Sequence, residues 1–231
     1  MQTIPVHLVF DLLAVVAAAG LTGALLRQGL IDVPGPATNL SSRYFAALGL
    51  GVVLGSFILG TANLWLSGVP TIGRSIIGAL TGGIAAVELH KHRNGITGST
   101  GLLFVPAFAS LVAVGRIGCA LSGLGDHTYG TPTALTWGQD FGDGIPRHPV
   151  ALYESLSMAA FLAVALVALI LRWPFFLANG FYVMVGFYAL QRFAWEFQKP
   201  YAVIIGPLNL FHLTALALFL YAGVMMRKVR R

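Results

Sequence analysis

Long apolar segments separated by short polar ones dominate this chain. Seven of them approach the roughly 20 residues that cross the hydrocarbon core of a bilayer. Their approximate bounds are residues 4–26, 44–66, 75–89, 101–121, 149–171, 173–195 and 207–226. The pattern predicts an all-α integral membrane protein, a single transmembrane domain over residues 1–231 built as a bundle of about seven transmembrane helices.

Two polar segments are longer than simple turns. Residues 28–42 contain proline and glycine and predict an irregular link. Residues 122–148 form a glycine-rich stretch with aspartates and histidines. A loop of more than about 20 residues is uncommon between helices unless it has a function. We therefore expect a long functional loop between the fourth and fifth helices.

The third apolar segment is short and rich in small residues. Gly78 and Gly82 lie four positions apart, which is the small-xxx-small spacing that lets two helix backbones approach closely. Packing against a neighbouring helix is the simplest interpretation of these glycines.

Composition agrees with a membrane protein. Hydrophobic residues make up 57% of the chain and charged residues 10%, whereas soluble domains carry about 25% charged residues. The net charge of +6 follows from orientation in the membrane rather than from binding nucleic acid. The single cysteine excludes an intrachain disulfide. The first residues lack the basic segment of a cleavable signal peptide.

The distribution of basic residues predicts the topology. Cytoplasmic segments of membrane proteins are enriched in Lys and Arg. With seven spans and the basic C-terminal tail in the cytoplasm, most of the 14 basic residues fall on the cytoplasmic side, and the N-terminus lies outside. The exceptions on the outer side are Arg74, Arg116, Arg147, Arg192 and Lys199. We interpret them as cations that bind an anion, although for Arg74 and Lys199 an ordinary surface position is an equal alternative.

Arg116 lies inside an apolar segment, where an arginine costs about 2.5–3.5 kcal/mol on insertion scales. The residues three, four and seven positions further along are Cys, Ala and Gly, so the guanidinium would have open space on its helical face. Arginine binds phosphate through two parallel hydrogen bonds. The alternative is a buried ion pair with Glu154 or Asp143.

A second arginine lies toward the outer end of the sixth helix. Tyr188, Arg192 and Glu196 follow one another at four-residue spacing and so share a helical face. A phenol and a guanidinium are suitable donors to a phosphodiester or a developing oxyanion. The alternative is an interfacial tyrosine beside an internal Arg192–Glu196 pair.

The long loop and its neighbours offer a base and a thiol. His148 directly precedes Pro149 and is a candidate general base, because histidine titrates near neutral pH. It could equally be a helix-start residue that bonds backbone. The aspartates and histidines of the loop lack compact metal-ligand spacing. Cys119 in an apolar helix is expected to be a small hydrophobe rather than a nucleophile.

Several motifs together resemble one enzyme family. The motifs are Thr81-Gly82-Gly83, Gly115-Arg116-Ile117-Gly118, Arg147-His148-Pro149-Val150-Ala151-Leu152-Tyr153-Glu154, and Tyr188 through Arg192 followed by Glu196-Phe197 and Pro200. In this order and at these distances they resemble bacterial prolipoprotein diacylglyceryl transferases. The resemblance covers the chain from the third span to the end.

The resemblance implies a multi-pass enzyme of the bacterial inner membrane with its active site facing the periplasm or outer leaflet. Such enzymes move the diacylglyceryl group of phosphatidylglycerol to the thiol of a lipobox cysteine and release glycerol phosphate, and no cofactor or metal is expected. The implied catalytic residues are Arg116, Arg192, Tyr188 and a base, His148 or His127. The implied substrate-binding residues are Gly82, Gly83, Gly118, Cys119, Gly130, Arg147, Tyr153 and Glu154.

This sequence departs from the family pattern on the acceptor side. Thr81 stands where the family has histidine, Cys119 and Ser122 replace its two asparagines, and His127, with Asp126 beside it, falls where its glutamate is expected. We therefore expect a divergent member that keeps the anionic phospholipid as donor. Its acceptor would be a lipobox protein or another protein or small molecule that offers a hydroxyl or amine.

The sequence is also compatible with two other functions. One is a non-catalytic module that binds or transports an anionic lipid. The other is a metal-dependent hydrolase that uses the aspartates of the loop.

Overall fold

The computed structural model describes residues 6–31 and 41–229, apart from the side chain of residue 126. Over these residues it has seven α-helices: α1 (Val6–Arg27), α2 (Ser42–Leu66), α3 (Ile76–Arg93), α4 (Phe104–Leu121), α5 (Val150–Ile170), α6 (Pro174–Glu196) and α7 (Leu210–Val229). The loop after α4 contains the 3₁₀ turn η2 (Leu124–Asp126) and the strands β1 (Gln139–Asp140) and β2 (Pro146–Arg147). The predicted helices are confirmed, and the predicted link over residues 28–42 lies mostly outside the described residues.

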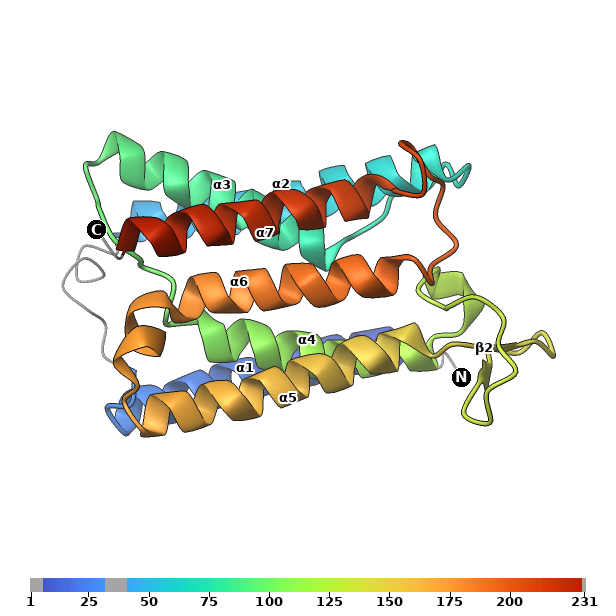
Figure 1. The fold of residues 1–231 in the computed structure, drawn as a ribbon, viewed down its shortest axis with the longest axis horizontal. Coiled ribbons are helices and arrows are strands. Elements are labelled where there is room, and N and C mark those ends of the chain that lie inside the picture. Colours follow the sequence, from blue (N-terminus) through green and yellow to red (C-terminus); the bar gives the residue numbers. More distant parts are fainter. Residues whose placement is uncertain (1–5, 32–40, 230–231) are drawn as a thin grey trace. The chain divides into compact units, whose positions relative to one another are not determined.

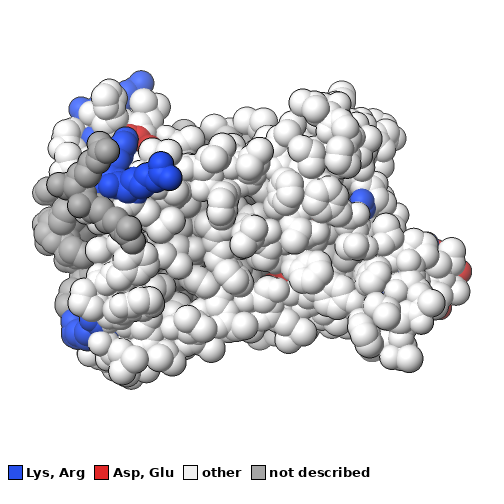
Figure 2. Space-filling view, in the orientation of Figure 1, with Lys and Arg blue, Asp and Glu red and all other residues white. Residues whose placement is uncertain are grey.

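Five of the helices, α1, α2, α4, α5 and α7, are long and apolar enough to cross a membrane. The helices α3 and α6 carry charged residues near their C-terminal ends, which lowers their mean hydropathy. Figure 2 shows a helix surface that is largely without Lys, Arg, Asp and Glu, with most visible charged atoms toward the helix ends. The class of all-α membrane protein is confirmed.

The described chain divides into two compact units, whose helices are drawn in Figure 1. The first unit comprises residues 6–31 and 101–200, with α1, α4, α5 and α6, and the second comprises residues 41–100 and 201–229, with α2, α3 and α7. The prediction of one transmembrane domain stays a prediction.

In the first unit, α4 lies at the centre and contacts α1, α5 and α6. Small residues allow this close packing: a Cβ on Gly118 would lie 2.6 Å from Cβ of Phe10 on α1. The hydroxyl of Ser155 on α5 donates to the Ala113 carbonyl at 2.5 Å and ties α5 to α4. This packing brings the C-terminal end of α4 beside the start of α5.

In the second unit, α2 and α3 meet backbone to backbone. A Cβ on Gly55 would overlap the Gly78 carbonyl, and a Cβ on Gly82 would overlap the Gly51 carbonyl. Only glycine fits at such a contact, as in closely packed membrane helices. The predicted role of the Gly78–Gly82 spacing in helix packing is confirmed, and α3 also contacts α7.

Candidate functional site

A buried group of charged side chains lies in the first unit, where α4, α5 and α6 meet. Arg116 on α4 is 5% exposed and Glu154 on α5 is 1% exposed. Nε of Arg116 lies 2.5 Å from Oε2 of Glu154. The alternative of an Arg116–Glu154 ion pair is thus confirmed. The Asp143 alternative is wrong, because Asp143 pairs with Arg147.

Arg192 on α6 converges on the same carboxylate. Its Nη1 donates to Oε1 of Glu154, and its Nη2 lies 2.8 Å from Oε2 of Glu196 one helical turn further on. The predicted Arg192–Glu196 pair is therefore present, together with a second partner. Tyr188 lies one turn before Arg192, is 1% exposed, and interacts electrostatically with both arginines and Glu154.

Lys199 completes the group. Its Nζ lies 2.8 Å from Oε1 of Glu154, and its side chain has no exposed surface. The sequence predicted Lys199 only as an outer-side cation with an ordinary surface position as an equal alternative. The sequence did contain an indication that Lys199 shares the face of Arg192, because residues 188, 192, 196 and 199 follow one another at helical spacing. We call Arg116, Glu154, Arg192, Glu196 and Lys199 the Glu154 cluster.

Charge balance explains why these side chains stay buried together. Moving a charge out of water costs several kcal/mol per ion unless partners with good geometry offset that cost. The cluster contains three cations and two carboxylates joined by ion pairs. One positive charge is left over. A buried region with surplus positive charge and several N–H donors favours an anion.

Other predicted residues form a separate set of contacts in and beside the loop between α4 and α5. The Tyr153 hydroxyl accepts a hydrogen bond from Nε1 of Trp137 at 2.9 Å and lies 3.3 Å from Nδ1 of His148. The ring of Tyr153 packs against Trp195 of α6 with centroids 5.1 Å apart. His148 is therefore held in a defined orientation by an aromatic side chain of α5.

Arg147 organises the turn of the β1–β2 hairpin. It makes two hydrogen bonds to Asp143, at 2.6 and 2.8 Å, and its guanidinium lies 5.3 Å from the ring centroid of Tyr129. The hydrogen bond from Arg147 lowers the pKa of the Asp143 carboxyl below its usual range. Oδ1 of Asp140 accepts three backbone N–H groups from the same turn. These contacts support a structural role.

The remaining predicted residues take the following positions. Cys119 lies one turn after Arg116, with Sγ 3.8 Å from Nη1 of that arginine. Gly130 donates its N–H to the His148 carbonyl, where a Cβ would clash. The backbone of His127 adopts the left-handed conformation, with φ 54°. Gly82 and Gly83 belong to the second unit, where both pack against α2.

Among the described residues, no group of three or more His, Cys, Asp or Glu side chains is placed to hold a metal ion.

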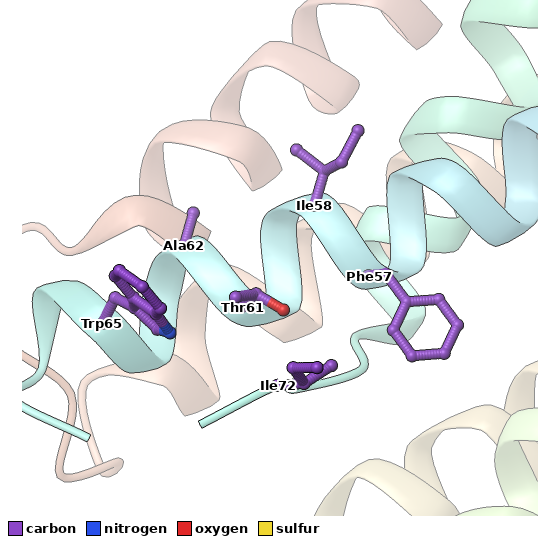
Figure 3. A pocket seen from close by; sticks show the side chains of 6 residues that line it. All are labelled: Phe57, Ile58, Thr61, Ala62, Trp65 and Ile72. Carbon is purple, nitrogen blue, oxygen red and sulfur yellow. The ribbon is translucent and has the colours of Figure 1, made fainter. Parts of the chain in front are cut away.

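A groove of about 660 Å³ lies on the second unit (Figure 3). Its walls are almost entirely apolar and come from α2 and the following turn, namely Phe57, Ile58, Thr61, Ala62, Trp65 and Ile72. The groove offers no charged group to a head group, so it does not compete with the Glu154 cluster as a candidate anion site.

The fold and the cluster define a class: a multi-helical membrane protein that holds a surplus of positive charge among its helices. Comparison with known families narrows this class. The family described as prolipoprotein diacylglyceryl transferase matches residues 4–227. The chain belongs to the prolipoprotein diacylglyceryl transferase family.

Individual relatives carry the same description. The chain is 33% identical to the phosphatidylglycerol–prolipoprotein diacylglyceryl transferase of Geobacter sulfurreducens over 54% of this chain and 49% of the relative. It is 32% identical to the protein of that name from Finegoldia magna over 54% of this chain and 48% of the relative. It is 36% identical to that of Bordetella parapertussis over 36% of this chain and 32% of the relative. The chain thus spans about half the length of these relatives or less.

Proposed function

We propose that this protein transfers a diacylglyceryl group from phosphatidylglycerol to an acceptor in the membrane of a bacterial cell. The observation that carries the proposal is the convergence of Arg116 and Arg192 on Glu154, inside a membrane protein of this family. Guanidinium groups recognise phosphate, as they do carboxylate, with two parallel hydrogen bonds. A phospholipid head group supplies such a phosphate at the surface of a bilayer.

The chemistry assigned to the cluster is stabilisation of a phosphate leaving group. With a cysteine acceptor, the sulfur forms a C–S bond to the glycerol carbon and the C–O bond to phosphate breaks. The bonding electrons leave with glycerol phosphate, and the thiol proton passes to a base. Arg116 and Arg192 stabilise the negative charge in a site with little water, where fixed donors are most effective. The Tyr188 hydroxyl is a further donor.

His148 is the base that the geometry favours over His127. Its ring is oriented by the Tyr153 hydroxyl, 3.3 Å from Nδ1. A thiol has an ordinary pKa near 8.5, so a base that removes its proton at neutral pH increases the fraction of reactive thiolate.

The position of the cluster in the first unit supports an outward-facing site. Nη2 of Arg172, which follows α5, donates to the carbonyl of Gly29, so the C-terminal ends of α1 and α5 lie together. Arg27 lies at the same end, and the Glu154 cluster lies at the opposite end of these helices. Because basic residues favour the cytoplasm, we place the cluster and the loop toward the periplasm or outer leaflet of the inner membrane.

One observation favours a second candidate, a lipid-binding module without catalysis. Thr81 stands where the family has histidine, and its hydroxyl donates to the Ile77 carbonyl of its own helix at 2.8 Å. It therefore offers no titratable group to an acceptor. The phosphate-binding cluster would be retained while the transfer reaction is lost.

The experiment is to incubate the purified protein with head-group-labelled phosphatidylglycerol and a peptide that bears a lipobox cysteine, or a hydroxyl or amine in its place. Release of glycerol phosphate that is lost in Arg116→Ala, but kept in the exposed control Arg93→Gln, supports the transferase. Saturable binding of phosphatidylglycerol without release by the unaltered protein supports the binding module. Absence of both results contradicts the proposal.

A further inference from the structure

Lys199 is buried although it lies beyond the last residue of α6. Its side chain has no exposed surface, and Nζ lies 2.8 Å from Oε1 of Glu154. Arg192 donates to the same oxygen, whereas Arg116 pairs with the other one. The ammonium group is thus placed against the two guanidinium groups that the proposed function assigns to phosphate.

The turn after α6 fixes this position. The backbone N–H of Lys199 donates to the Glu196 carbonyl at 3.1 Å, which extends the end of the helix by one turn. A cation is favoured at a helix C-terminus. The neighbouring Gln198 accepts a hydrogen bond from the Thr131 hydroxyl at 2.6 Å and ties the turn to the outer loop. Contacts to the end of α6 and to the loop after α4 therefore both fix the backbone position of Lys199.

The charges of the cluster show what Lys199 contributes. Arg116 and Arg192 are balanced by Glu154 and Glu196, so these four residues together are neutral. These four residues offer N–H donors to an anion but no net positive charge. Lys199 adds the surplus positive charge.

We propose that Lys199 is the third cation that contacts the phosphate of the bound lipid, next to Arg116 and Arg192, and that its charge sets the affinity for the anionic head group. This inference rests on the proposed function and adds a specificity residue to it. Glu154 then acts as a positioning residue that keeps the three cations together before the lipid arrives.

Because Lys199 can lose its proton, the proposal predicts that lipid binding depends on pH. The groups that face Lys199 are Arg116 on α4, Glu154 on α5, and Arg192 and Glu196 on α6. Burial lowers the pKa of Lys199 to about 8, repulsion by the arginines acts in the same direction, and the two carboxylates oppose it. The ammonium is therefore mostly charged at pH 7 and mostly neutral at pH 9. Arginine keeps its charge throughout this range.

The test measures binding of phosphatidylglycerol in detergent, with phosphatidylcholine as the neutral comparison, at several values between pH 6.5 and 9.5. The same series is measured for Lys199→Met, Lys199→Arg and the exposed control Arg93→Gln. We expect Lys199→Met to weaken binding of phosphatidylglycerol about 10- to 100-fold at pH 7, the effect of losing a hydrogen bond to a charged group. We expect the affinity of the unaltered protein to fall above pH 8, and Lys199→Arg to remove that fall.

Equal affinity of Lys199→Met and the unaltered protein would overturn the inference, as would the same alkaline fall in Lys199→Arg. If Lys199→Met does not fold, the comparison of Lys199→Arg with the unaltered protein decides. Failure of the proposed function is recognised separately, because the unaltered protein would then release no glycerol phosphate or show no preference for phosphatidylglycerol over phosphatidylcholine.

Discussion

Arg116 and Glu154, on the adjoining ends of α4 and α5, are joined by an ion pair of 2.5 Å between Nε and Oε2. The other ion pairs of the cluster are built around this one. Arg192 and Lys199 both reach the second oxygen of the same carboxylate. Three side chains, from α4, α6 and the turn after α6, therefore depend on Glu154.

Replacement of Glu154 by Gln is expected to destabilise the protein strongly. The change leaves three buried cations opposite one carboxylate, and loss of one partner from a buried pair costs about 3–5 kcal/mol. Thermal unfolding in detergent measures the effect. Asp143→Asn removes a carboxylate from the partly exposed Asp143–Arg147 pair and is the control, with a smaller expected change. Equal unfolding temperatures for the two variants would contradict this view of the cluster.

Conversion of Arg116 to Lys is expected to lower kcat about 10²- to 10³-fold, the effect of losing one preorganised donor to a developing charge. Lysine keeps the charge, but it lacks the planar group whose N–H bonds reach Glu154 and a phosphate in parallel. Steady-state release of glycerol phosphate is the measurement. The equivalent conversion of the exposed Arg93 should leave the rate unchanged. Full activity of Arg116→Lys would show that charge alone suffices.

The two candidate bases are separated by parallel substitutions. We expect His148→Gln to lower kcat about 10²-fold, the smaller end of what general base catalysis contributes, and His127→Gln to have little effect. Tyr153→Phe should fall between them, because it removes the hydroxyl that orients His148. Rates are compared across pH 6 to 9. The reverse order of the two histidine variants would assign the base to His127.

Stability is expected to change with pH because of Lys199. Its pKa is about 8 in the folded protein and near 10.5 when exposed, so between these values the unfolded chain binds more protons. Stability therefore rises as the pH increases from 8 toward 10.5, and the full cost of the buried charge is present below pH 8. The unfolding temperature of the unaltered protein should therefore rise relative to that of Lys199→Met over this interval. A constant difference would show that Lys199 does not titrate there.

The contact between α2 and α3 gives a steric prediction. Gly82→Ala is expected to reduce the unfolding temperature, because the added Cβ would overlap the Gly51 carbonyl, which is backbone and cannot rotate away. Gly49→Ala on α2 has no heavy atom within 4 Å of the added Cβ and is the matched control. Similar stability of the two variants would show that the helices can separate without cost.

Much of the fold follows from hydropathy alone. Each predicted helix is present with ends shifted by a few residues, because a long apolar segment has few alternatives to a helix in lipid. The Gly78–Gly82 spacing indicated close packing, but it did not identify the partner. Gly51 and Gly55 on α2 became visible as that partner only once the helices were placed.

The candidate site was predictable only in part. Arg116 and Arg192 stood out because charged residues inside apolar segments are costly. Lys199 did not stand out, because it follows the sixth apolar segment in a stretch whose sequence is typical of a surface turn. Its burial depends on Glu154, which is 45 residues away in the chain. The helical stripe that continues from Tyr188 and Glu196 to Lys199 indicates the face on which the lysine lies, but no local pattern identifies Glu154 as its partner.

The glycine contact between α2 and α3 also bears on how the chain enters the bilayer. The α3 helix falls outside the set that is apolar and long enough to cross by itself, whereas α2 meets that condition. The segment that joins them is short, and their backbones touch where Gly51 and Gly55 face Gly78 and Gly82. We expect the two segments to leave the translocation machinery together as a hairpin, with the more apolar helix carrying its weaker neighbour into the lipid.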